Sequence, residues 1–236
     1  MDKRYSLQHS DEGGRLAALR RYGILDTPKE EEFDDFAILA AGICQTPIAG
    51  VSFVDQNRQW LKAEVGLGVR ETSLDVSICR HAILEKEVFI VPDTTRDERF
   101  HNNPLVTGEP HLRFYAGAQL ISAESMPLGT VCVLDYEPRQ LTEIQTRSLR
   151  ALARQVMNIL DLRFAVKEIA QKNAVLEKTM AKMKTLEGLL PICSSCKKIR
   201  DKDHWMMVEE YVQKHTDASF THGLCPCCRQ SYLKES

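Results

Sequence analysis

Residues 48–54 read IAGVSFV and residues 59–65 read QWLKAEV, and this pair of segments decides the fold that the sequence predicts. Both segments are short, apolar and rich in residue types that favour strands. Asp55, Gln56 and Asn57, which lie between them, are typical of a tight turn. The sequence therefore predicts a β-hairpin, which belongs to a largely antiparallel sheet.

Further strand-like runs follow at 88–91, 113–121 and 129–134. Apolar residues occupy alternate and intervening positions in several runs, so both faces of the sheet are expected to be covered. Thr27 and Glu30 form a capping box with Pro28 at the first helical position, which predicts a helix from there. One face of that helix carries Phe33, Phe36, Ala37, Ala40 and Ala41. We expect an α+β fold in three layers, with helices on both faces of the sheet.

The stretch 139–187 contains neither Pro nor Gly and predicts one helix about 65 Å long. Thr142 and Gln145 form a capping box at its start, and Gly188 with Pro191 marks its end. Apolar residues repeat every seven positions in two series three residues apart, which predicts a parallel coiled-coil homodimer over 159–187. The series are Leu152, Ile159, Val166, Asn173 and Met180, and Leu162, Ile169, Leu176 and Met183. The alternative is one amphipathic helix packed on its own domain.

Composition narrows the functional classes. The 236 residues carry 31 Lys and Arg against 33 Asp and Glu, so no global positive field favours nucleic acid or an anionic membrane. The longest apolar run, 36–44, is half of what a membrane span needs, and the first residues hold no apolar signal region. We therefore expect a cytoplasmic protein. In that compartment the eight cysteines stay reduced, and clustered ones are more typical of metal binding than of disulfides.

Four of the cysteines form two C-x2-C pairs near the C-terminus, Cys193 with Cys196 and Cys225 with Cys228. Four thiolates at this spacing are typical of a structural, tetrahedral Zn²⁺ site without an open position. A segment as short as 188–236 is marginally stable without such a staple. The sequence leaves open whether His222 or Cys227 replaces one ligand. Two alternatives stay open for this segment. It could be a zinc finger that binds nucleic acid, although its basic and acidic residues nearly balance. Its cysteines could also be reduced thiols that pack as small apolar residues and bind no metal.

Residues 15–158 resemble the GAF domains of bacterial sensor proteins. The resemblance implies a six-stranded antiparallel sheet that serves in small-molecule sensing or dimerisation. It leaves 1–14 as a flexible N-terminus and 159–187 as a linker helix. The matching segments are ALR (18–20), GILDTP (23–28), VSFVD (51–55), RQW (58–60), SICRHAI (77–83), VPD (91–93), RFHNNPLVTG (99–108), RFYAGA (113–118) and GTVCVLD (129–135).

The segment 188–236 resembles a cysteine-rich module at the ends of some bacterial histidine kinases and response regulators. The matching residues include Cys193, Cys196, Trp205, Cys225 and Cys228. This resemblance implies a sensor kinase or response regulator as protein partner. A phosphoacceptor His box, a GGDEF-like run and a receiver-type acidic pocket are not recognisable in the sequence.

Seven residues are the candidates for a ligand site in the GAF domain. Cys79 and His81 open the segment that, by resemblance, runs beside the ligand pocket. The others belong to a loop and its following strand, rich in Arg, Asn and aromatic residues, that would close over a small ligand. They are Asp93, Arg99, Phe100, Asn103 and Arg113. For all seven the alternative is a packing role. Cys44 and Cys132 lie in apolar patterns and are expected to be buried.

Together these features predict a sensory or regulatory protein of bacterial signal transduction that is not an enzyme. A GAF domain would bind a small molecule, which the sequence does not identify, and a coiled coil would relay the signal to the zinc module. The alternatives are a redox enzyme like the free methionine sulfoxide reductases, which share the GAF fold, and a zinc finger that binds nucleic acid. The redox enzyme would need a second cysteine near Cys79, and the loop 92–110 contains none.

Overall fold

The structure is a computed structural model that describes residues 12–85, 87–182 and 189–232. The chain divides into two compact units, residues up to 167 and residues from 168 onward. Predictions for 1–11, for the end of the coiled coil at 183–187 and for a helix stop at Gly188 lie outside the described residues. No helix in the described part of the chain is both long and apolar enough to cross a membrane.

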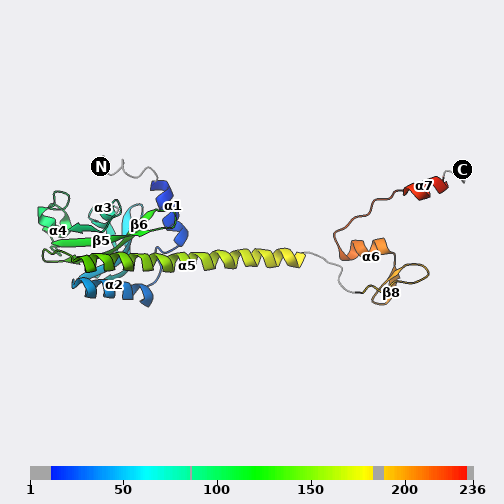
Figure 1. Ribbon diagram of the computed structural model, residues 1–236, viewed down its shortest axis with the longest axis horizontal. Helices are drawn as coiled ribbons and strands as arrows, with labels where there is room; N and C mark the ends of the chain where they lie inside the picture. Colours follow the sequence, from blue (N-terminus) through cyan, green and yellow to red (C-terminus); the bar gives the residue numbers. More distant parts are fainter. Residues whose placement is uncertain (1–11, 86, 183–188, 233–236) are drawn as a thin grey trace. The chain divides into compact units, whose positions relative to one another are not determined.

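The first unit is built on a six-stranded sheet in which every paired strand is antiparallel (Figure 1). Its spatial order is β3-β2-β1-β6-β5-β4. The predicted hairpin is confirmed, and so is the antiparallel sheet implied by the resemblance. The bounds are β1 Ile48–Val54, β2 Arg58–Val65, β3 Glu71–Ser73, β4 Phe89–Val91, β5 Phe114–Ile121 and β6 Pro127–Asp135.

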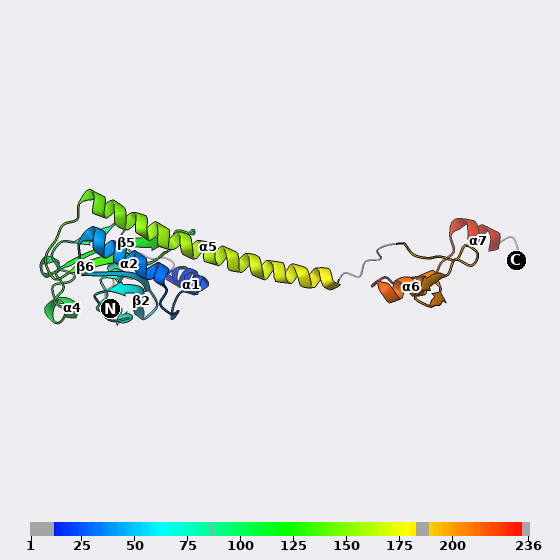
Figure 2. The ribbon, with the colours of Figure 1, turned by 90° about the horizontal axis from the view of Figure 1, so that it is seen from below.

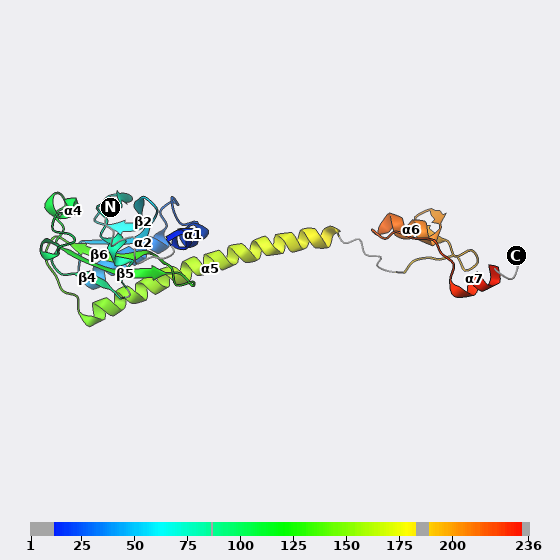
Figure 3. The same ribbon diagram turned by 90° about the horizontal axis from the view of Figure 1, so that it is seen from above.

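Helices and loops cover both faces of this sheet (Figures 2 and 3). One face packs against α1 (Glu12–Tyr22), α2 (Glu31–Cys44) and the first part of α5 (Glu143–Lys182). The opposite face packs against α3 (Cys79–Ala82), α4 (Pro104–Thr107) and the loops around them. The short helix η1 (Thr94–Arg96) lies between β4 and α4 in the chain. Every residue of β1 is buried, as expected for a strand covered on both faces.

The start of α2 differs from the prediction. The helix begins at Glu31, and Glu30 at its N-cap makes no side-chain capping bond. The buried ammonium of Lys62 instead binds Thr27 Oγ1 at 2.8 Å and the Glu30 carboxylate. The capping-box side chains are therefore engaged by a lysine from β2 and not by the helix end.

A β-bulge places Lys62 where it meets Glu30. In the β1–β2 ladder Val51 pairs with Ala63 and Ser52 with Leu61, so Lys62 is the extra residue. A bulge of this kind redirects one side chain relative to a regular strand. It turns Lys62 toward α2, where its Nζ lies 5.1 Å from the centre of the Phe33 ring.

The long helix α5 starts as predicted. Thr142 and Gln145 exchange the two hydrogen bonds of a capping box, at 3.0 and 3.2 Å. Apolar residues of its first part are buried against the sheet, among them Leu149, Val156 and Leu160. Beyond them the apolar residues of the predicted seam are exposed. They are Leu162, Val166, Ile169, Leu176 and Met180.

The second unit holds the end of α5, from residue 168 onward, a short hairpin and two short helices. The hairpin is β7 (Ile199–Asp201) with β8 (His204–Met206), and it is followed by α6 (Val208–His215) and α7 (Pro226–Tyr232). Among the residues from 168 onward whose side chains the structure describes, Ile199 alone is buried. A unit with so little buried apolar surface gains little stability from the hydrophobic effect.

Candidate functional site

A cavity of about 370 Å³ lies on the α3 side of the sheet in the first unit. Its walls come from β2, β5 and β6 and from the segments 67–72, 77–79 and 105–112. Most lining side chains are apolar, and a few polar groups converge among them, which is the usual character of a small-molecule site. The lining residues are Gln59, Leu61, Leu67, Val69, Glu71, Thr72, Ser77, Ile78, Cys79, Leu105, Glu109, Pro110, Leu112, Tyr115, Cys132 and Leu134.

Strand alternation selects which residues reach this cavity. Cys132 and Leu134 on β6 share one parity and face the cavity, whereas Val131 and Val133 pack in the core of the opposite face. Gly50 on β1 pairs with Cys132, and a Cβ at Gly50 would stand 3.9 Å from the Cys132 sulfur. The same Cβ would stand 3.3 Å from the Leu61 side chain and from the Ala63 carbonyl oxygen, so the glycine lets these groups pack closely beside the thiol.

Two thiols and three hydroxyls meet at this end of the cavity. The sulfurs of Cys79 and Cys132 lie 3.8 Å apart. Tyr115 Oη donates to Cys79 Sγ at 3.2 Å, and Ser52 Oγ donates to the same sulfur at 3.5 Å. Ser52 also hydrogen-bonds Thr130 at 3.2 Å. All five side chains are buried, so these contacts form a polar cluster in an otherwise apolar interior.

The two thiols are electrostatically unequal. Burial opposes ionisation of Cys79, but hydrogen bonds from Cys132, Ser52, Thr130 and Tyr115 outweigh it and lower the pKa of the Cys79 thiol. The hydrogen bond with Cys79, together with burial, raises the pKa of the Cys132 thiol well above its usual value. Negative charge in the pair is therefore favoured on Cys79.

Of the seven predicted ligand residues, Cys79 lines this cavity and the other six do not. His81 lies with its ring edge-to-face against Phe100, the two centres 5.1 Å apart. Phe100 is itself buried in the core of this face. Arg99 pairs with Asp97 at 2.6 Å and lies over the Phe89 and Phe100 rings.

The remaining three residues fix the loop that covers the cavity. Asp93 accepts a hydrogen bond from the Thr95 amide and begins η1. Asn103 caps α4 through the Leu105 amide and donates to the Val76 carbonyl at 3.0 Å. Arg113 donates to the carbonyl oxygens of Val106 and Leu112. The loop lines the cavity through Leu105, Glu109, Pro110 and Leu112.

Sequence reasoning missed Tyr115 and Cys132 as parts of the site. Cys132 was predicted only as a buried thiol, and it is buried, as is Cys44. The signal that was available is the strand pattern, because Tyr115 and Leu134 are partners in the β5–β6 ladder. That register places Tyr115 on the cavity side with Leu134, and Cys132 lies two residues before Leu134 on the same side of β6.

In the second unit, Cys193 lies in a turn typical of a metal-binding cysteine pair. The Lys197 amide donates to the Cys193 carbonyl at 3.0 Å, and Lys197 adopts a left-handed φ of 60°. Backbone N–H groups of Cys196, Ser195 and Lys197 face the Cys193 sulfur and lower the pKa of its thiol. Such amides are the groups that neutralise a metal-bound thiolate.

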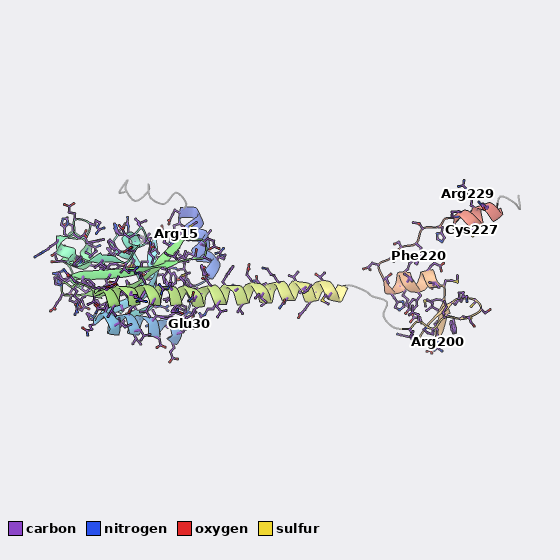
Figure 4. The ribbon with its side chains drawn as sticks, in the orientation of Figure 1. Arg15, Glu30, Arg200, Phe220, Cys227 and Arg229 are labelled. Carbon is purple, nitrogen blue, oxygen red and sulfur yellow. The ribbon has the colours of Figure 1, made fainter. Side chains whose placement is uncertain are left out.

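The second cysteine pair lies at the start of α7, where Figure 4 labels Cys227. Backbone and side-chain hydrogen bonds from Cys228 and Cys227 lower the pKa of Cys225 to about 7. Within 12–85, 87–182 and 189–232 the structure does not bring three His, Cys, Asp or Glu side chains into a metal-holding group. The two pairs thus have suitable donors and local turns, whereas a four-thiolate site remains a prediction.

Comparison with known proteins identifies the family. The GAF domain model matches residues 12–160, so the chain belongs to the GAF domain family. A cyclic di-GMP phosphodiesterase of Pseudomonas aeruginosa is 46% identical over 148 residues, which are 62% of this chain and 25% of that protein. The chain therefore spans about a quarter of the length of this curated relative.

Three solved structures are among those similar to this chain. The GAF domain of an Acinetobacter phosphoenolpyruvate-protein phosphotransferase is 18% identical, covers 66% of this chain and 98% of its own, and gives a TM-score of 0.47. The PixJ GAF domain of Thermosynechococcus elongatus is 19% identical, covers 66% of this chain and 95% of its own, and gives a TM-score of 0.48. The free methionine-R-sulfoxide reductase of Neisseria meningitidis is 14% identical, covers 72% of this chain and 95% of its own, and gives a TM-score of 0.45.

One prediction is corrected by these findings. The sequence predicted a protein that is not an enzyme, but the 46% identical relative is named as a cyclic di-GMP phosphodiesterase. The prediction rested on the lack of a recognisable output domain in the sequence. The relative, however, is named as an enzyme, and the match covers only 25% of its length.

Proposed function

We propose that this protein is a sensory or regulatory GAF-domain protein of bacterial signal transduction, and that its cavity binds a small molecule. The observation that carries this proposal is the cavity of about 370 Å³, with its mostly apolar lining. Gln59, Ser77 and Tyr115 supply hydrogen-bonding groups along its wall, which would fix the orientation of a ligand.

The regulated output is proposed to belong to cyclic di-GMP signalling. The support is the 46% identity with a cyclic di-GMP phosphodiesterase over 148 residues, most of the GAF region. In this proposal the GAF unit responds to its ligand and changes the rate of an enzymatic output or of a kinase or response-regulator partner. Hydrolysis of cyclic di-GMP, measured with the purified chain and with candidate partners added, is the first activity to assay.

The route from cavity to output is proposed to run through α5. Leu61 lines the cavity, and its neighbour Lys62 binds Glu30. Glu30 in turn binds Arg163 of α5 at 2.6 Å, and Glu30 is labelled beside this helix in Figure 4. Beyond Arg163 the helix exposes an apolar seam, which supports pairing with α5 of a second chain. Asn173 at an a position favours parallel, in-register pairing.

The cysteine-rich unit is proposed to hold one structural Zn²⁺ through Cys193, Cys196, Cys225 and Cys228. The turn at Cys193, the donor set and the small buried core of this unit support the proposal. The ion would supply folding free energy by closing the unit, and the folded unit would present a surface to a protein partner.

Blocking the mouth of the cavity tests the ligand proposal. Val69 lines the cavity and is 43% exposed, so Val69→Trp adds bulk at the mouth without overfilling a core. We expect wild-type protein, purified under gentle conditions, to carry a small molecule in native mass spectra, and Val69→Trp to lose it. Leu39→Trp, on the exposed side of α2, is the matched control and should retain it. An empty wild-type cavity, or equal loss in both variants, would contradict the proposal.

A further inference from the structure

The two cysteines at the end of the cavity are placed for chemistry that ligand binding does not require. Cys79 is the first residue of α3, and Cys132 lies in the middle of β6, 53 positions further along the chain. Their sulfurs are 3.8 Å apart and both line the cavity. A disulfide needs about 2.05 Å, so the sulfurs must approach by about 2 Å. Cys79 lies in a helix of only four residues.

The surroundings give the two thiols different roles. Tyr115 and Ser52 donate hydrogen bonds to the sulfur of Cys79, and such bonds stabilise a thiolate. The Cys132 sulfur instead lies 3.6 Å from the carbonyl oxygen of Gly50, an acceptor that favours its protonated form. Cys79 is therefore the nucleophile of the pair, and Cys132 is the thiol that resolves an oxidised Cys79.

We propose that Cys79 and Cys132 form a redox-active pair that an organic hydroperoxide oxidises to a disulfide inside the cavity. The Cys79 sulfur attacks the terminal oxygen of the hydroperoxide, the O–O bond breaks, and the alkoxide leaves as an alcohol with the Cys79 proton. The Cys132 sulfur then attacks the sulfenic acid at Cys79, forming the S–S bond. The departing hydroxide takes the Cys132 proton and leaves as water. Two thiols lose two electrons, and one hydroperoxide becomes one alcohol and one water.

The cavity favours an organic hydroperoxide over a more polar oxidant. Its lining beside the thiols is apolar, with Leu61, Ile78, Leu112 and Leu134. Its volume of about 370 Å³ accommodates a small alkyl group next to the sulfurs. The proposal uses the same cavity as the ligand proposal, but it stands or falls separately, because its product is a covalent bond that forms without any bound ligand.

Peptide mass spectrometry of the full-length protein tests the proposal directly. The reduced protein is treated with one equivalent of tert-butyl hydroperoxide, alkylated and digested with trypsin. We expect peptides 71–80 and 114–139 to appear joined, lighter by two hydrogens than their sum. Dithiothreitol should separate them. Cys44 is the internal control, because it is buried on the other face of the sheet and burial raises the pKa of its thiol to about 11. It should stay alkylatable at this dose.

Variants separate the two roles. With Cys132→Ser we expect no joined peptides, and a sulfenic acid at Cys79 that dimedone traps. With Cys79→Ser we expect Cys132 to remain reduced, and with Cys44→Ser we expect the link to form as in the wild type. If Cys79 stays reduced while cysteines of the second unit are oxidised, or if Cys79 and Cys44 react at the same rate, the proposal is overturned. The wild-type result decides the matter even where a variant folds poorly.

Discussion

The Glu30 carboxylate joins three parts of the first unit through charge. It binds the fully buried Lys62 of β2 and the Arg163 guanidinium of α5, and Glu32 binds the same guanidinium at 2.5 Å. Burial opposes ionisation of Glu30, but its bonds to Lys62 and Arg163 outweigh this and lower its pKa. A buried ammonium without its carboxylate is costly, so Glu30 has more effect on stability than an ordinary surface acid.

We predict that Glu30→Gln lowers the free energy of unfolding by about 1–2 kcal/mol, less than for a fully buried pair because Glu30 is partly exposed. Glu32→Gln is the matched control, since Glu32 is half exposed and pairs with Arg163 alone; it should cost less than about 0.5 kcal/mol. Urea unfolding followed by circular dichroism measures both. Equal effects of the two changes would show that the bond to Lys62 contributes nothing.

The same pair predicts a pH signature. A carboxyl whose pKa is lowered on folding stabilises the folded state above its unfolded pKa and loses that effect as the pH falls. The difference between wild type and Glu30→Gln should therefore be complete near neutral pH and shrink from about pH 4.3 downward. A difference that is constant between pH 7 and pH 3 would assign it to packing and not to charge.

Among the elements, α5 is packed against the sheet only over its first part, and its later apolar residues are exposed. The exposed seam residues Val166 and Ile169 are each 58% exposed, and Val175, on another side of the helix, is 65% exposed. We predict that Ile169→Glu converts a dimer to a monomer at micromolar concentration, whereas Val175→Glu does not, because two carboxylates would meet only in the seam. Light scattering coupled to size exclusion measures both. A wild-type protein that is already a monomer rules out the coiled coil.

Elements could be predicted from the sequence where a local pattern was enough to define them. The apolar runs at 48–54 and 129–134 became buried strands, and Thr142 with Gln145 capped α5 as expected. β3 was missed because its three residues, Glu71–Ser73, hold no apolar pattern. The start of α2 was misplaced because a β-bulge, which depends on strand register, brings Lys62 to Thr27 and Glu30. The side chains of Thr27 and Glu30 therefore bind the Lys62 ammonium and do not cap the helix.

The same limit applies to the site. Cys79 could be assigned to the pocket side from the GAF resemblance, but its partners Tyr115 and Cys132 are distant in sequence and meet it only through the β5–β6 register. Arg99 and Asn103 attracted attention because polar side chains gather in their loop. Their hydrogen bonds instead hold that loop in place, since Arg99 donates to Asp97 and Asn103 donates to the Val76 carbonyl.

At the scale of the whole molecule, the two units differ in what stabilises them. The first has a large apolar core on each face of its sheet. The second has Ile199 as its buried residue among those described, together with surface contacts such as Lys214 with Asp201 at 2.8 Å. Exposed ion pairs contribute about 0–1 kcal/mol, whereas a structural zinc contributes about 10–16 kcal/mol of apparent folding free energy. The second unit should therefore depend on metal, and the first should not.

We predict about one equivalent of zinc per chain, lost in Cys193→Ser and in Cys228→Ser, as measured by elemental analysis of freshly reduced protein. Cys227→Ser and His222→Ala should retain most of the metal, because four thiolates already complete a tetrahedral shell. Removing the metal with a strong chelator should abolish amide-exchange protection in 189–232 and leave the strands of the first unit protected. If Cys228→Ser retains the metal and Cys227→Ser loses it, Cys227 and not Cys228 is the fourth ligand. If freshly reduced wild-type protein contains no metal, the chain has no zinc site. Protection that survives chelation throughout 189–232 would mean that this unit folds on its small core alone.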